Sequence, residues 1–210
     1  MEEFEKDVHN FEPLKQGWFK PRETARYLAD FATKKEIFLL LWLVSFASAI
    51  SNVGTEGTDE VVGDVNIWLI ILGVIIFAPL LGYIGFVLSA GLTWLVGKMF
   101  GGKGKFKSLF RAFIGASLPA IIASPFYLAW AILEPTTYLN PTLGATTPIA
   151  IIAGLLLFVT SVWAFVNQVI AVAEIHEFSI GKAILTILLP IIVLVIIFVV
   201  IFIAIIGVMI

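Results

Sequence analysis

The sequence contains few of the residues that carry most enzyme chemistry. Its 210 residues include no cysteine and only two histidines, and 13% of them are charged. The absence of cysteine excludes disulfides, thiolate metal ligands and a cysteine nucleophile. His9 and His176 also lack the close spacing of zinc-binding histidines on one helix. We therefore expect neither a metal nor another cofactor.

Hydrophobic residues, in contrast, make up 60% of the chain, and its mean hydropathy is +1.05. A soluble domain of this size has about a quarter of its residues charged, roughly twice the share in this chain. The longest polar stretch is the N-terminal arm, residues 1–36, which is too short to enclose a hydrophobic core. The composition therefore indicates an integral membrane protein.

Five apolar stretches are long enough to cross a bilayer, since a spanning helix needs about 20 residues. The predicted fold class is all-α, a bundle of five transmembrane helices over residues 37–210. We place the spans at about residues 35–52, 67–96, 109–133, 148–172 and 183–208. The second is longer than the hydrocarbon core, and a kink at Pro79, a tilt or an interfacial first turn would absorb the excess. The fifth is apolar on every side after Pro190, so we expect it to face lipid.

Basic residues distinguish the two sides of the membrane. Residues 1–36 contain seven lysines and arginines, residues 97–111 contain five, and the remaining one is Lys182. The connections at residues 51–66 and 133–147 contain none. Because basic loops stay on the cytoplasmic side, this alternation predicts a cytoplasmic N-terminus and an extracytoplasmic C-terminus.

The arm contains a predicted amphipathic helix that begins at Pro21, a residue suited to a first helical turn. Its apolar stripe comprises Tyr27, Leu28 and Phe31, and its basic surface comprises Arg22, Arg26, Lys34 and Lys35. We expect this helix to lie on the inner leaflet, with Trp18 and Phe19 as interfacial anchors. It would either orient the first span or dock a cytoplasmic partner.

The connection after the second span is rich in glycine and lysine. Residues 97–103 match the first seven positions of a phosphate-binding P-loop, but Gly104 replaces the serine or threonine that binds magnesium. The segment also follows a membrane helix instead of a strand, so we reject nucleotide hydrolysis. A tight turn against anionic headgroups fits better, with about 1 kcal/mol for each basic residue at the surface. These basic residues include Lys98, Lys103, Lys105 and Lys107.

A polar cluster is predicted near the cytoplasmic end of the fourth span. Glu174 and Glu177 share a helix face, and either can pair with Lys182 or with a lysine of residues 97–111. Asn167 and Gln168 lie one turn deeper in the membrane. Amides at that depth must form hydrogen bonds, so this pair either bridges helices or lines a polar cavity.

The pattern of residues argues against an enzyme. The chain has no nucleophile elbow, no carboxylate pair within the spans and no histidine-rich helix. The spans also have no ionisable residue at mid-membrane depth, where ion-coupled transporters usually place one. We expect no catalytic residues and no nucleic-acid partner.

Several motifs resemble the Yip (Ypt-interacting protein) family in its shorter bacterial form. Before the first span the residues are Trp18, Pro21, Arg22 and Thr24, and after the second they are Gly97, Lys98, Gly101, Gly102, Lys103, Gly104 and Phe106. The third span has the segment from Ala112 to Pro119, and the residues before the fifth are Ala173, Glu174, Phe178, Ser179, Lys182 and Ala183. The resemblance covers nearly the whole chain.

The resemblance implies five helices, a cytoplasmic N-terminus and, for the bacterial form, a location in the plasma membrane. Eukaryotic members resemble trafficking factors that associate with small GTPases and with each other through a longer cytoplasmic region. The arm of this chain has only 36 residues, which argues against GTPase binding. Bacterial relatives resemble accessory or assembly proteins of ABC-type exporters.

We therefore interpret the chain as a non-enzymatic membrane scaffold or adaptor whose partners are the bilayer and another membrane protein or itself. The expected interface comprises Trp18, Pro21, Arg22, Arg26, Lys98, Lys103, Lys105 and Lys107, and small residues of the second and third spans would mediate assembly. The alternative is a small permease or channel whose polar path reaches Asn167 and Gln168. Amides sealed between helices would contradict that alternative.

Overall fold

The computed structural model describes residues 12–56, 66–140 and 147–209. Every regular element in these ranges is a helix. The helices are α2 (Pro13–Gln16), α3 (Pro21–Asp30), α4 (Lys34–Glu56), α6 (Ile67–Met99), α7 (Phe106–Ala116), α8 (Ala120–Leu133), α9 (Pro135–Leu139), α11 (Pro148–His176) and α12 (Ile180–Met209).

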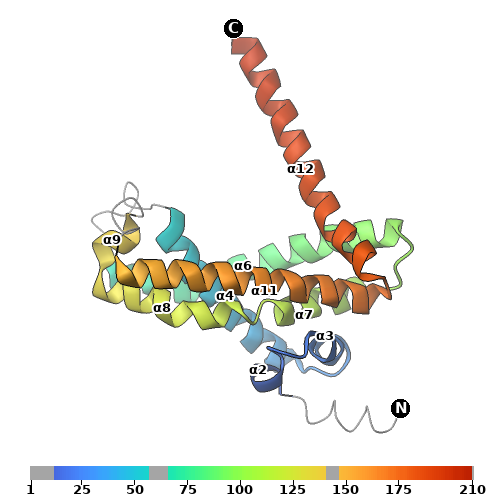
Figure 1. Ribbon diagram of the computed structural model, residues 1–210, viewed down its shortest axis with the longest axis horizontal. Helices are drawn as coiled ribbons and strands as arrows, with labels where there is room; N and C mark the ends of the chain where they lie inside the picture. The colour runs from blue at the N-terminus through green and yellow to red at the C-terminus, as the bar shows by residue number, and fades with distance from the viewer. Residues whose placement is uncertain (1–11, 57–65, 141–146, 210) are drawn as a thin grey trace.

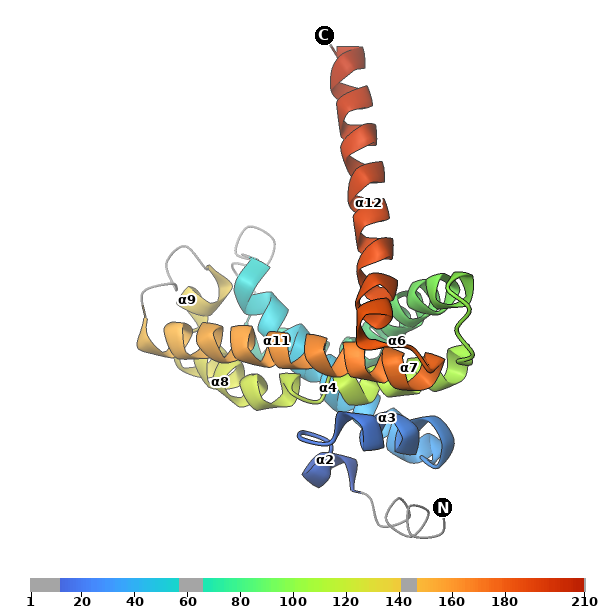
Figure 2. The ribbon, with the colours of Figure 1, turned by 45° about the vertical axis from the view of Figure 1, so that its right-hand side comes forward.

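The long helices form an elongated bundle (Figure 1). Helix α4 packs on α6 and α8, and α11 packs on α7 and α8. Helix α3 of the arm lies across one side of this bundle and contacts α7 and α11. Helix α12 leaves the bundle and projects away from it (Figure 2). Its side chains from Ile191 to Ile203 are exposed, as expected for a helix that faces lipid.

Four helices, α4, α6, α11 and α12, are long and apolar enough to cross a membrane. A further candidate consists of α7 and α8 together, which are bent by 51° at their junction. The expected helical composition is therefore confirmed, with four or five candidate spans.

The stretch expected as one span over residues 109–133 is interrupted in the structure. Helix α7 ends at Ala116 and α8 begins at Ala120, with Pro119 immediately before it. Proline has no N–H to donate to the preceding turn and its ring crowds that turn, which favours a break. Pro79 and Pro125 nevertheless lie inside helices that continue past them. The position of a proline in the sequence therefore does not by itself predict whether a helix breaks there.

The three basic segments of the sequence meet at one end of the bundle. Arg111 of α7 contacts the end of α3, Lys103 contacts Glu177 after α11, and Lys182 of α12 contacts the carbonyl of Phe100. At the other end, the Tyr138 hydroxyl of α9 donates a hydrogen bond of 2.6 Å to the Ile50 carbonyl of α4. This division agrees with the basic and non-basic connections predicted from charge.

Because the chain has no cysteine, single cysteines can report the topology directly. We expect Lys105→Cys to react with a membrane-impermeant maleimide only after the cells are permeabilised. Thr136→Cys in α9 should react in intact cells, since it lies at the end without basic residues. Labelling of both positions from the same side would contradict the predicted topology.

Candidate functional site

The basic end of the bundle is organised by the docking of α3 onto α7. The side chains of Tyr27 and Leu28 are buried in a cluster with Ile114 and Leu118. The approach is close at Gly115, where a Cβ atom would collide with the Leu28 side chain. The expectation that this apolar stripe faces the inner leaflet is therefore wrong for Tyr27 and Leu28, which α7 and α4 cover, whereas Phe31 is 43% exposed.

Polar contacts hold α3 in place from both neighbouring helices. The Arg111 guanidinium donates hydrogen bonds to the carbonyls of Leu28, Ala29 and Ala32 at 3.4, 3.4 and 3.3 Å, where the helix ends. A cation at a helix C-terminus interacts favourably with the unpaired carbonyls and the helix dipole. Arg26, on the opposite side of α3, forms an ion pair with Glu174 of α11.

The junction between α3 and α4 is stabilised by a separate hydrogen bond. The Tyr27 hydroxyl donates a hydrogen bond of 2.7 Å to Glu36 of α4. Burial, together with this bond to the carboxylate, raises the pKa of Tyr27 to about 12. The phenol therefore stays protonated and continues to donate at any physiological pH.

The glycine-rich connection does not lie freely against headgroups as the sequence suggested, because its glycines enclose His176. At Gly97 a Cβ would lie 2.6 Å from the His176 Nε2 atom, and at Gly102 it would collide with Nδ1. The loop closes on itself through a 2.8 Å hydrogen bond from the Gly102 N–H to the Gly97 carbonyl. Trp94 of α6 adds a 3.1 Å bond from its indole N–H to the Gly104 carbonyl.

The imidazole of His176 is a packing element in this arrangement. It is buried, it stacks on Phe178 at 5.3 Å between ring centroids, and neither ring nitrogen has a partner among the described residues. No group of metal-binding side chains occurs in the described part of the chain. Positions 97 and 102 are thus glycines for a steric reason, because a side chain there would collide with His176. The comparison with a P-loop did not reveal this reason.

The polar cluster expected from Asn167, Gln168, Glu174, Glu177 and Lys182 is divided in the structure. Lys103 binds Glu177 at 2.6 Å, one of the pairings the sequence allowed, and this hydrogen bond raises the pKa of Lys103. Glu174 binds Arg26 of α3 instead of a lysine. Lys182 donates a hydrogen bond of 3.1 Å to the Phe100 carbonyl and lies over the Phe178 ring. These contacts join the glycine-rich loop to the ends of α11 and α12.

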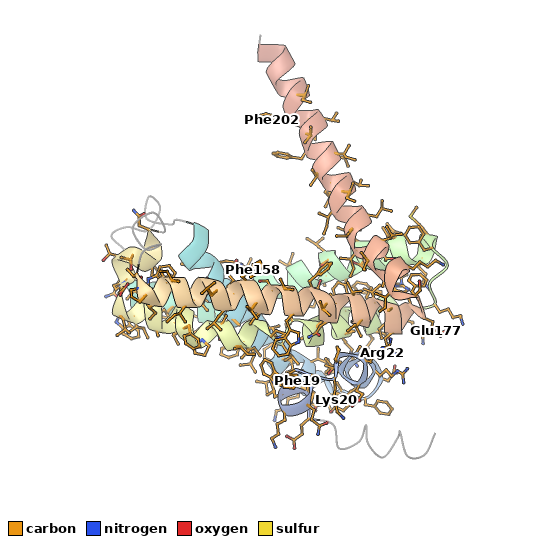
Figure 3. The ribbon with its side chains drawn as sticks, in the orientation of Figure 1. Phe19, Lys20, Arg22, Phe158, Glu177 and Phe202 are labelled. Atoms are coloured by element: carbon orange, nitrogen blue, oxygen red, sulfur yellow. The ribbon has the colours of Figure 1, made fainter. Side chains whose placement is uncertain are left out.

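Six of the residues expected at the interface are exposed, Arg26 and Lys103 among them. The other four are Arg22, Lys98, Lys105 and Lys107. None of them forms an ion pair with another described residue. Arg26 and Lys103, in contrast, are occupied by their internal ion pairs. Figure 3 shows Arg22 toward the same end of the bundle as Glu177, the partner of Lys103 in the glycine-rich loop.

The two aromatic residues before α3 behave differently. Trp18 is half-buried and packs against the cluster that contains Leu28, and Pro21 begins α3. Phe19 is exposed, and its ring lies 5.5 Å from that of Trp163 on α11. The arm is therefore attached to the bundle over its described length.

A second polar feature, a cleft, lies between α4, α6 and α11. It consists of two adjacent hollows of about 330 and 490 Å³ whose linings share Ser48, Asn52 and Gln168. Asn167 is only 3% exposed and does not line either hollow. Consecutive residues of a helix point in directions about 100° apart, which explains why the two amides separate. The sequence signal for this cleft was the set of serines at the end of the first span.

Fold and composition define the class of the protein as a polytopic helical membrane protein. The sequence model of the Yip1 domain matches residues 15–202, nearly the whole chain, and the chain therefore belongs to the Yip1 domain family. The comparisons with curated proteins and with solved structures returned no match. Family membership confirms the resemblance found in the sequence.

The Arg111 contacts predict that Arg111→Met loosens α3 without unfolding the bundle. Loss of a cation from three carbonyls should speed amide hydrogen exchange in α3 by about tenfold. Lys107→Met on the same helix is the matched control, because Lys107 is exposed and has no ion pair in the described chain. Equal exchange in both variants would contradict the role of Arg111.

The packing around His176 predicts that Gly102→Ala is destabilising. Overpacking should cost about 1–3 kcal/mol, or roughly 5 °C in the unfolding temperature in detergent. Gly154→Ala is the control, because a Cβ there meets nothing within 4 Å. In a His176→Ala background the same change at Gly102 should cost less, although the Gly97 carbonyl oxygen would still lie 2.8 Å from the added Cβ. Additive losses would show that the imidazole is not the cause.

Proposed function

We propose that this Yip1-family protein is a non-enzymatic membrane scaffold that docks other membrane proteins through its basic end. The observation that supports this proposal is the set of exposed cations Arg22, Lys98, Lys105 and Lys107, which form no ion pair with the residues that the structure describes. They project from helices and a loop that buried contacts already hold in place. A preorganised surface loses less conformational entropy on binding than a flexible one.

The chemistry of this surface favours an acidic cytoplasmic segment of another membrane protein. Complementary charge speeds encounter and sets orientation, whereas exposed pairs add modest affinity. The same cations also lie where anionic headgroups would attract them, which would keep the surface close to the membrane. The predicted topology places this end in the cytoplasm, and the proposed location is a bacterial plasma membrane.

We propose further that the scaffold assists assembly, with an ABC-type exporter as the candidate partner that the family resemblance suggested. Small-GTPase binding remains disfavoured, since helix α3 of the arm packs on α7 and α11. The Yip1 domain family is not known as an enzyme family, which supports a non-catalytic role.

The permease alternative predicted a polar path that reaches Asn167 and Gln168. Asn167 is enclosed between helices, with its amide nitrogen unpaired within the described chain, whereas Gln168 lines the polar cleft. Only one of the two amides is therefore sealed, and the exposed cations of the basic end favour docking over conduction. We therefore prefer the scaffold.

The double variant Lys105→Glu/Lys107→Glu should weaken capture of the partner in mild detergent by tenfold or more. Each reversal replaces an attraction of about 1 kcal/mol with repulsion. Lys105→Arg/Lys107→Arg, which keeps both charges, is the matched control and should bind normally. Quantitative mass spectrometry of material co-purified from native membranes measures the difference. Unchanged recovery with the glutamate variant would refute docking through this surface.

A further inference from the structure

The polar cleft between α4, α6 and α11 is lined by side chains that are unusual at this depth in a membrane bundle. The smaller hollow is bounded by α4, α11 and the junction of α7 and α8, and the larger one by α4, α6 and α11. Their hydroxyl and amide side chains are Ser45, Ser48, Ser51, Asn52, Ser89, Ser117, Thr160, Ser161 and Gln168.

One buried polar atom of this cleft has no partner. Ser45 is 4% exposed, it lines the larger hollow, and its Oγ atom forms no hydrogen bond with any described residue. A hydroxyl buried without a hydrogen bond costs about 1–3 kcal/mol judged by protein mutations. Several neighbouring hydroxyls are satisfied by carbonyls of their own helix, as at Ser51 and Thr160. The Ser45 Oγ atom packs against Gly82 of α6, where a Cβ would collide with it, at the edge of the larger hollow.

The break between α7 and α8 borders the same cleft. Ser117, which ends α7, and Ala120, which begins α8, both line the smaller hollow. Irregular backbone within a membrane is tolerated where it is buried in protein or lines a cavity. Interrupted helices of membrane proteins often mark ligand sites for this reason. The break borders the smaller hollow and Ser45 borders the larger one, and the two linings share Ser48, Asn52 and Gln168.

The lining residues specify an uncharged ligand. No lysine, arginine, histidine, aspartate or glutamate lines either hollow, so an ionised headgroup would be buried without a counter-charge. The Gln168 amide both donates and accepts, and the serine hydroxyls do the same. A ligand that carries hydroxyl groups matches this set of donors and acceptors.

The cleft opens on the side of the bundle. Leu81 lines the larger hollow and Phe165 the smaller one, and these side chains are 64% and 40% exposed on the outer surface of α6 and α11. A molecule can therefore enter from the lipid while its acyl chains stay along the apolar exterior. The volumes of about 330 and 490 Å³ lie in the usual range for small-molecule sites.

We propose that this cleft binds the uncharged, hydroxyl-bearing head of a membrane lipid of the diacylglycerol class. Gln168 and Ser48, which line both hollows, are the central binding residues. The site is separate from the basic surface proposed for docking, and either can exist without the other.

The test uses the full chain in phosphatidylcholine vesicles and a diacylglycerol that carries a photoreactive diazirine. We expect Gln168→Leu to lower photolabelling at least threefold, and Ser48→Ala/Gln168→Leu about tenfold, since each lost neutral hydrogen bond weakens binding severalfold. Unlabelled diacylglycerol should compete, and phosphatidic acid, whose head is ionised, should not. Equal labelling of wild type and double variant would overturn the proposal.

A matched pair of threonines separates binding from stability. Thr160 and Thr186 are both buried, and each donates a 2.8 Å hydrogen bond to the carbonyl four residues earlier. Only Thr160 lines the cleft, so Thr160→Val should lower labelling while Thr186→Val should not. Equal loss in both variants would overturn a local site and indicate general destabilisation.

Free glycerol in the same assay distinguishes the source of the hydroxyl groups. Displacement by millimolar glycerol as effective as that by diacylglycerol would uphold a hydroxyl site and overturn lipid as its source. Gln168→Leu could instead leave labelling unchanged and abolish the capture of a partner membrane protein. That result would overturn the lipid site and show that the cleft docks a helix.

Discussion

The scarcity of water around the bundle is the constraint on which this structure depends, because hydrocarbon offers no hydrogen bonds to buried polar groups. Hydroxyls such as those of Ser51 and Thr160 therefore donate to carbonyls of their own helices. Near the basic end, Arg111 donates hydrogen bonds to the carbonyls at the end of α3. Ser45 departs from this pattern, since its Oγ atom has no hydrogen bond among the described residues and packs against Gly82.

Steric fit and charge act together at the basic end. The glycine-rich loop can surround His176 because positions 97 and 102 have no side chain. Lys103 then reaches Glu177, and Lys182 reaches the loop carbonyl at Phe100. The cations that form these internal contacts are different residues from those proposed to bind a partner. The basic surface and the polar cleft thus differ chemically, since exposed cations form the first and neutral polar side chains line the second.

Much of the architecture was accessible from the sequence, and the limits have physical causes. Long apolar runs identified α4, α6, α11 and α12, because a helix in lipid needs only length and hydrophobicity. Length and hydrophobicity do not predict the break before Ala120. The prolines do not predict it either, since Pro79 and Pro125 lie in unbroken helices. The sequence pattern also assigned the Tyr27 and Leu28 stripe to lipid, because an apolar stripe looks identical whether lipid or α7 covers it.

The sequence by itself determined the class, the Yip1 family and the segregation of basic residues, since these depend on composition and on the order of residues along the chain. Only the tertiary structure decided which cations are paired, why Gly97 and Gly102 are glycines, and which of the two neighbouring amides lines the cleft. Each of these depends on contacts between residues distant in the chain. Their distances and directions arise only when α3, α7, α11 and the glycine-rich loop pack together.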